Sequence, residues 1–322
     1  MLILVSFFLC LLLALHAYRQ YWAKRDLPHV YTDNFDGELM QVGETFIARR
    51  SARNGSQRTI VCFPGFLEDM RYFQDVYKDD EAELILVNNA NYHCPLVAGD
   101  VTKLAWAANP FVMGTIEHDA FYLGLVLERL ATGHNIHLHG HSRGGAVVLE
   151  TGRQYPELTG SKERYVSAIL EAAVLPQART AGKGSDPLPH LLVSYFMPIY
   201  LGLLRNISED RLLKNLMMRP TNALKTQLCL SCFSLPCRYD TCVTNVKSIV
   251  AWQRARHFDV YNNFASMTVV LGARDSVLDN RTMLASAEKG QARNKGVTIL
   301  KTENTNHFIS LEQPETIQGI SK

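Results

Sequence analysis

The residues best suited to chemistry form the run Gly140-His141-Ser142-Arg143-Gly144, which fits the pattern G-x-S-x-G. An apolar stretch ends at His139 and a helical pattern starts at Gly144, so the serine follows a strand and precedes a helix. A sharp turn at this point lifts the serine hydroxyl above the sheet, and the small residues let the strained backbone pack without clashes. The helix N-terminus also favours developing negative charge. The pattern predicts that Ser142 is a nucleophile.

A serine hydroxyl needs a base to remove its proton, and the base needs an acid to orient it. Asp275 follows the apolar stretch 266–272 directly, at the strand end where open α/β sheets place their sites. His307 comes later, after the last expected strand, which gives the chain order Ser, Asp, His. We expect Asp275 as the acid and His307 as the general base, with Asp279 and Glu171 as alternative acids.

Three histidines, His137, His139 and His141, alternate along the expected strand before the serine and raise the possibility of a metal site. No aspartate stands beside them, and His141 is accounted for as the residue before the nucleophile. We therefore expect buried or hydrogen-bonded histidines there. Because serine, base, acid and backbone amides supply every catalytic role, we expect neither a metal nor an organic cofactor.

The elements that must position these residues alternate between strand and helix patterns, which is typical of a doubly wound α/β fold with a mostly parallel sheet. A hairpin at 38–49 comes first. Strands are expected at 58–63, 82–87, 135–139, 165–174, 266–272 and 296–300, and helices at 69–77, 115–130, 144–155, 280–291 and from residue 310.

The alternation stops between residues 175 and 265, which we interpret as a cap inserted between the core segments 26–174 and 266–322. Within the cap, residues 188–204 contain no Asp, Glu, Lys or Arg. We expect a lid helix whose apolar face covers the active site and suits an acyl chain. A second transmembrane helix is the alternative, but it would be short and interrupted by Pro198 and Gly202.

The cap also contains four of the seven cysteines, Cys229, Cys232, Cys237 and Cys242. A zinc site, one or two disulfides, and four unlinked thiols are all compatible with this cluster. Its spacings are wider and less regular than those of paired C-x-x-C motifs, so the sequence leaves all three interpretations open.

The first eighteen residues carry no charged side chain, and aromatic and basic residues follow them up to Arg25. This pattern predicts a membrane anchor over residues 1–25. A cleaved signal peptide is the rival, but the basic n-region is missing and Leu15 is bulky where a cleavage site after Ala17 prefers a small residue. The positive-inside rule favours a cytoplasmic body, although three basic residues beside so short a tail do not decide the side.

Composition narrows the class of protein. The chain of 322 residues is 47% hydrophobic and 20% charged, which excludes a disordered chain and allows a large buried core. Its 33 lysines and arginines nearly balance 31 acidic residues, and no long basic run is present. Nothing here indicates a nucleic-acid partner.

Around His307 the sequence resembles the α/β-hydrolase superfamily, because a histidine followed by an aromatic residue and then Leu-Glu-Gln-Pro-Glu often ends its esterase-like and lipase-like members. The resemblance covers roughly residues 55–320 and is weak through the cap. Asn306 replaces the glycine that usually precedes the histidine, which makes the loop less flexible but leaves the base in place.

The resemblance implies an oxyanion hole made by the backbone N–H groups of Arg143 and Phe66. Pro64 stands where the family often has a histidine. It also implies hydrolysis of carboxylic esters through an acyl-serine intermediate. The apolar surface of the expected lid helix, together with the anchor, favours lipids or other acyl substrates. A serine peptidase or amidase, and a catalytically silent binding or scaffold protein, are the alternative functions.

Overall fold

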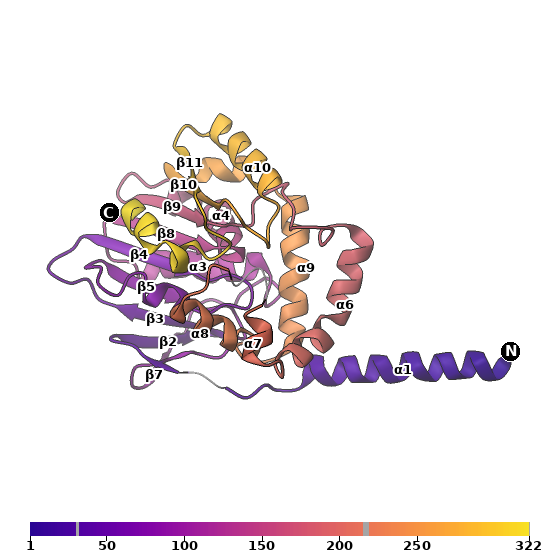
Figure 1. Ribbon diagram of the computed structural model, residues 1–322. Helices are drawn as coiled ribbons and strands as arrows, with labels where there is room; N and C mark the ends of the chain where they lie inside the picture. Colours follow the sequence, from indigo (N-terminus) through magenta and orange to yellow (C-terminus); the bar gives the residue numbers. More distant parts are fainter. Residues whose placement is uncertain (30–31, 215–218, 322) are drawn as a thin grey trace.

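The computed structural model describes residues 1–29, 32–214 and 219–321. At its centre lies a nine-stranded sheet in the order β11-β10-β9-β8-β4-β5-β3-β2-β7, covered by helices on both faces (Figure 1). Its strands are β2 (Glu38–Val42), β3 (Thr45–Arg50), β4 (Arg58–Phe63), β5 (Glu83–Val87), β7 (Val101–Lys103), β8 (Asn135–His141), β9 (Tyr165–Glu171), β10 (Ser266–Gly272) and β11 (Val297–Thr302). Two further strands, β1 (Asp33–Asn34) and β6 (Leu96–Val97), pair with each other.

The six strands β11, β10, β9, β8, β4 and β5 run parallel, so their carboxyl ends meet along one edge of the sheet. The hairpin β2–β3 forms as its alternating pattern predicts, and its strand β3 pairs antiparallel with β5. The central strands are nearly continuous apolar runs because helices cover both of their faces. Strand β8 lies between β4 and β9, which places its end in the middle of that edge.

The helices of the core are α2 (Arg71–Gln74), α3 (Ile116–Arg129), α4 (Arg143–Gln154), α5 (Pro156–Thr159), α10 (Asn280–Arg293), α11 (Ile309–Glu312) and α12 (Pro314–Ile320). Side chains fix two of the starts, because Thr115 accepts a hydrogen bond from the His118 N–H and Asp279 accepts one from the Thr282 N–H. The mostly parallel, doubly wound fold expected from the sequence is confirmed.

Two expected elements are shorter in the structure. The helix expected over 69–77 is regular only over α2. The side chain of Asp69 reaches forward to accept from the Arg71 N–H, which accounts for the late start of the helix. The strand expected over 165–174 ends at Glu171. Beyond it the chain bends at Ala172, whose φ is 40°, and the Val174 N–H donates to the carbonyl of Ser142.

Helices occupy much of the expected cap, namely α6 (Pro187–Leu204), α7 (Glu209–Leu212), α8 (Ala223–Ser231) and α9 (Tyr239–Ala255), with two 3₁₀ turns, η2 (Cys232–Ser234) and η3 (Phe258–Asn263). Helix α9 packs between α6 and the core helices α3 and α4. All seven cysteines lie in the described part of the chain and are free thiols there, including the four of the cap.

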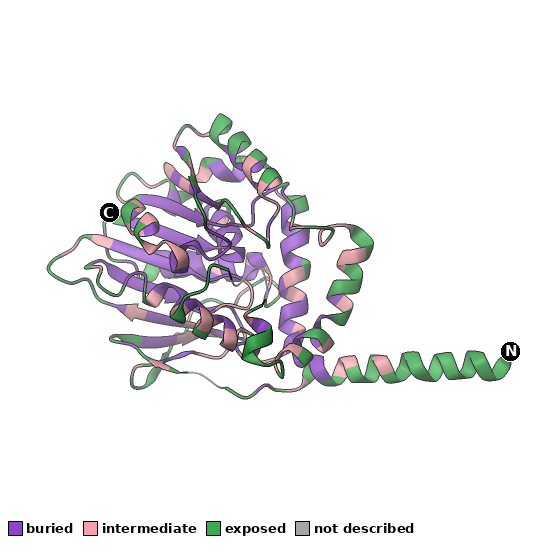
Figure 2. Ribbon diagram, viewed as in Figure 1, coloured by how far each residue is buried: buried purple, intermediate pink, exposed green. Residues whose placement is uncertain are grey.

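The first helix, α1 (Leu2–Lys24), has a free part and a packed part. Residues 1–14 are exposed all round, and α1 projects away from the rest of the molecule (Figures 1 and 2). Near its end, Trp22 and Ala23 are buried against the cap. Among the described helices, α1 and α6 have the length and apolar composition needed to cross a membrane.

Candidate active site

Ser142 stands at the turn between β8 and α4, where its φ of 51° and ψ of −116° lie outside the regions that side chains usually occupy. The turn needs glycine on both sides. A Cβ at Gly140 would lie 2.4 Å from the carbonyl oxygen of Gly144, and one at Gly144 would lie 2.0 Å from the carbonyl oxygen of Phe63. The Ser142 N–H donates to the carbonyl of Glu171, which ties the turn to the neighbouring strand.

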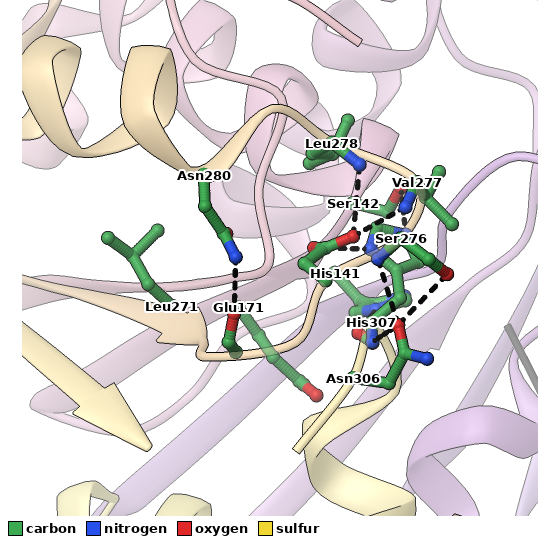
Figure 3. Close-up of polar contacts among 12 residues, drawn as sticks. His141, Ser142, Glu171, Leu271, Ser276, Val277, Leu278, Asn280, Asn306 and His307 are labelled. Atoms are coloured by element: carbon green, nitrogen blue, oxygen red, sulfur yellow. Dashed lines mark hydrogen bonds and ion pairs between the residues drawn. The ribbon is translucent and has the colours of Figure 1, made fainter. Parts of the chain in front are cut away.

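The structure brings together the three residues that the sequence predicts. The Ser142 Oγ lies 2.9 Å from His307 Nε2, and His307 Nδ1 lies 2.8 Å from Asp275 Oδ2. All three side chains are almost entirely buried. Figure 3 shows Ser142 and His307 facing each other, with the backbone of Val277 and Leu278 alongside.

The second oxygen of Asp275 is also bound. It accepts hydrogen bonds from the N–H groups of Val277 and Leu278, at 2.8 and 2.9 Å. Burial alone would raise the pKa of Asp275, but the neighbouring His307 and these N–H donors lower it. The carboxylate therefore stays ionised. In the tautomer of His307 that carries its proton on Nδ1, Nδ1 donates to this carboxylate and Nε2 can accept a proton from the Ser142 hydroxyl.

The alternative acids lie elsewhere. Asp279 caps α10, as noted above. Glu171 accepts hydrogen bonds from His139, Tyr72 and Ser310. Burial would raise its pKa, but these donors and the charges of the nearby histidines lower it to about 2.

The histidines before Ser142 are hydrogen-bonded, as predicted. His139 lies between Tyr77 and Glu171, and His137 bonds to Ser167. His141 stacks on Tyr72 and bonds through Nδ1 to Glu68 Oε2 at 2.6 Å. Its Nε2 donates to the backbone carbonyl of His307 at 2.8 Å.

Burial favours a neutral His141, but the Glu68 carboxylate overcomes this effect and raises the pKa of His141 to about 9. A buried ion pair thus lies directly behind the triad and holds the backbone of His307. Glu68, His141 and His307 place their nitrogen and oxygen atoms within 4.8 Å of one another, a spacing that could suit a metal ion. Each of these imidazole nitrogens already has a hydrogen-bond partner, so a metal ion would have to displace the hydrogen bonds of the triad.

The two amides expected for the oxyanion hole lie at the same edge of the sheet. The Arg143 N–H is in the first turn of α4, where backbone donors have no partner within the helix. Phe66 lines the cavity that also contains Ser142, and Gly65 beside it donates its N–H to Glu68. Their role as oxyanion donors stays a prediction.

The side chain of Arg143 has a structural function that its position in the motif does not reveal. It is fully buried and bonds to Asp119 Oδ2 at 2.7 Å, to Asn89 Oδ1 at 2.9 Å and to the carbonyl of Gly114. Burial would raise the pKa of Asp119, but the guanidinium lowers it. The pair fixes the first turn of α4, and with it the amide that follows the serine.

Asn306 connects the loop that carries the histidine to the loop that carries the acid. Its Oδ1 accepts from the N–H and hydroxyl of Ser276 and from the N–H of His307, and Figure 3 shows it between these two residues. A glycine could make none of these contacts. The departure from the family pattern therefore adds a connection between the two loops.

A cavity of about 350 Å³ opens beside the triad, a size typical of small-molecule sites. Its lining is mostly apolar and comes largely from the cap, with Met197, Leu201 and Leu204 of α6, Leu228 and Cys229 of α8, and Phe233 after it. The expected lid helix therefore does lie over the site. Burial raises the pKa of Cys229 to about 12, so this thiol stays protonated.

Sequence reasoning did not find Glu68, Tyr72 or the Arg143–Asp119 pair. The only signal for Glu68 was its place three residues after Gly65, in the loop expected to hold an oxyanion donor. The other contacts join segments far apart in the chain, so they can be recognised only in the three-dimensional structure.

No family model matches the chain, and no curated protein matches its sequence. Solved structures match it over nearly its full length. An esterase from Exiguobacterium antarcticum matches with a TM-score of 0.59 at 15% identity, over 88% of this chain and 99% of that one. An esterase from Thermogutta terrifontis gives 0.57 at 16%, over 86% and 92%. MenH from S. aureus gives 0.58 at 14%, over 85% and 95%. With the sheet order and the serine turn, these likenesses show that the chain has the fold of the α/β-hydrolase superfamily.

Proposed function

We propose that this protein is a serine hydrolase that cleaves carboxylic esters through an acyl-serine intermediate. One observation carries the proposal. Ser142, His307 and Asp275 form a continuous hydrogen-bonded chain, with distances of 2.9 and 2.8 Å, at the wall of an apolar cavity. This arrangement is the one that activates a serine hydroxyl.

In the first half of the reaction, His307 Nε2 takes the proton of Ser142 as Oγ attacks the ester carbonyl carbon. Asp275 stabilises the imidazolium that forms, and its N–H donors keep it in place. The N–H groups of Arg143 and Phe66 donate to the oxyanion. His307 then protonates the leaving alcohol, which departs and leaves the acyl group on Ser142.

In the second half, His307 removes a proton from water, which attacks the acyl carbonyl carbon. The tetrahedral intermediate collapses, the bond to Ser142 Oγ breaks, and His307 returns the proton to the serine. The carboxylic acid is released and the enzyme is regenerated. Each proton passes through His307. The position of this imidazole relative to Ser142 and Asp275 therefore controls both the acylation and the deacylation of the serine.

The substrate class follows from the cavity and from α1. A cavity lined by leucine, methionine and phenylalanine side chains suits an acyl chain, since each buried methylene contributes roughly 0.8 kcal/mol. Helix α1 is apolar and exposed all round over residues 1–14, which suits a membrane anchor. A membrane-attached enzyme acting on lipids or other long-chain acyl esters accounts for both features.

Labelling with a fluorophosphonate probe tests the proposal before any substrate is known. An activated Ser142 attacks the phosphorus, so the native protein is labelled and Ser142→Ala is not. Ser208→Ala, which changes an exposed serine in the cap, serves as the control and is labelled normally. An unlabelled native protein would favour the silent binding or scaffold alternative.

A further inference from the structure

The outer face of α6 is apolar and exposed. Leu188, Leu192, Phe196, Tyr200 and Leu203 follow one another at spacings of four or three residues, and each is 39–65% exposed. This spacing places them in one row along the helix. The opposite face, with Met197 and Leu201, is buried against the cap. Soluble surfaces seldom leave such a row uncovered.

Helix α6 is held rigidly against the base of α1. Arg19 Nε donates to the carbonyl of Tyr195 at 2.9 Å, its guanidinium lies 4.9 Å from the centre of the Tyr195 ring, and His16 bonds to the Tyr195 hydroxyl. Further on, Trp22 fills the space above Gly202, where a Cβ would lie 2.3 Å from the indole. These contacts define how the two helices are oriented relative to each other in the structure.

The orientation of α6 relative to α1 determines how α6 would lie against a membrane that α1 enters. In Figure 1, α6 runs across the direction of α1, on the side of the molecule from which α1 projects. The contacts with α6 begin at His16 and Arg19, where the apolar run of α1 gives way to basic and aromatic residues. Such residues mark the membrane–water interface. A helix that crosses α1 at this level lies along the membrane surface.

We propose that the outer row of α6 is immersed in the phospholipid leaflet that α1 enters, and that acyl chains reach the cavity beside α6 directly from this leaflet. The second part rests on the proposed function. Tyr200 supports entry from the leaflet, because this residue is 57% exposed on the outer row and also lines the cavity. Met197, Leu201 and Leu204 continue the apolar path from there toward Ser142.

Lipid contact is tested with single tryptophan substitutions in the full-length chain, reconstituted into phosphatidylcholine vesicles whose acyl chains carry bromine. Leu192→Trp probes the outer row. Tyr165→Trp is the matched control, because both positions are 49% exposed and Tyr165 begins β9, at the edge of the sheet opposite to the one where β8 ends before Ser142. The wild-type emission is subtracted from each. We expect the indole added by Leu192→Trp to be blue-shifted and quenched several-fold more strongly than the one added by Tyr165→Trp. Equal weak quenching, or a chain that does not bind the vesicles, overturns the proposal.

Substrate entry from the leaflet is tested by placing a glutamate at the same two positions. Leu192→Glu should lower hydrolysis of a long-chain ester in vesicles about tenfold or more, because a carboxylate opposes immersion. It should leave hydrolysis of a short soluble ester unchanged, and Tyr165→Glu should change neither. If Leu192→Glu and Tyr165→Glu hydrolyse the long-chain ester in vesicles at equal rates, the proposal that substrate enters from the leaflet is overturned. If the Leu192→Trp variant is quenched but no ester is cleaved, α6 docks as proposed and the proposed function fails.

Discussion

At Ser142 the hydroxyl, the imidazole and the carboxylate depend on one another, because each hydrogen bond fixes the protonation that the next one needs. We expect Ser142→Ala and His307→Ala each to lower kcat for a p-nitrophenyl ester by a factor of about 1,000 or more, with the double variant little worse than either. Asp275→Asn should also lower it steeply, since an amide favours the wrong tautomer of His307.

Steady-state kinetics on the purified variants check this expectation. Asp279→Asn is the matched control, because it makes the same change at the cap of α10, and it should keep normal activity. Full activity in Ser142→Ala would contradict the mechanism. Normal activity in Asp275→Asn would remove this residue from it.

The buried pair of Glu68 and His141 predicts a dependence of stability on pH. The pKa of His141 is raised from about 6.5 to about 9 in the folded protein. A raised pKa means that the charged form stabilises the fold. This contribution is complete below about pH 6.5, declines as the pH rises, and is lost above about pH 9.

Thermal unfolding of the native protein and of Glu68→Gln, followed from pH 6 to pH 10, measures the contribution. The variant lacks the carboxylate that contributes most to stabilising a charged His141, so its Tm should lie well below that of the native protein near pH 6.5 and approach it above about pH 9. A difference in Tm that is constant with pH would show that Glu68 acts by shape and hydrogen bonding alone.

The sequence predicts the triad because each member follows a strand, and parallel strands bring those ends together. It does not predict the side-chain contacts that hold the triad residues in place. The partner of His141 comes from a loop 73 positions away, and Asn306 reaches Ser276 across 30 positions. Neither pairing leaves a local pattern, since each depends on which loops the folded sheet places side by side.

Among the elements, the strands are predicted best, because burial on both faces demands long apolar runs. The short strands β1, β6 and β7 were not expected, since strands of two or three residues show no periodicity. The order of helices within the cap was not predicted either. Helix α6 was recognised from the lack of charge, but its contact with α1 depends on tertiary packing alone.

That contact gives a prediction at the level of elements. Gly202→Ala adds a Cβ that would lie 2.3 Å from the Trp22 ring, so we expect a lower Tm and a loss of stability of roughly 1–3 kcal/mol from overpacking. Gly319→Ala in α12 is the control, since nothing lies within 4 Å of its added Cβ. It should be neutral or slightly stabilising, because alanine favours a helix. An equal Tm for both variants would contradict tight packing at Gly202.

At the scale of the whole molecule, the apolar surface of α1 predicts the behaviour of the protein in fractionated cells. It should sediment with membranes and stay there in high salt, because the attachment is apolar and ionic screening does not weaken it. Removing residues 1–15 should remove the attachment through α1 and leave only the weaker one proposed for the outer row of α6, so that much of the protein is released. A cut at residue 25 would also remove the buried Trp22 and Ala23. N-terminal sequencing decides whether the helix is retained, and a chain beginning after Ala17 would mean a cleaved signal peptide.

The rigid corner between α1 and α6 limits how the molecule can move. A body attached by one flexible segment tumbles freely beside a membrane, and its active site faces the lipid for only part of the time. Here, Tyr195 and Trp22 join the body to α1, so under the proposed membrane attachment rotation about the membrane normal and drift in the plane are the main motions left. For the lipid substrate that we propose, the search would then take place in two dimensions, and its rate would depend on the number of ester molecules per unit area of membrane.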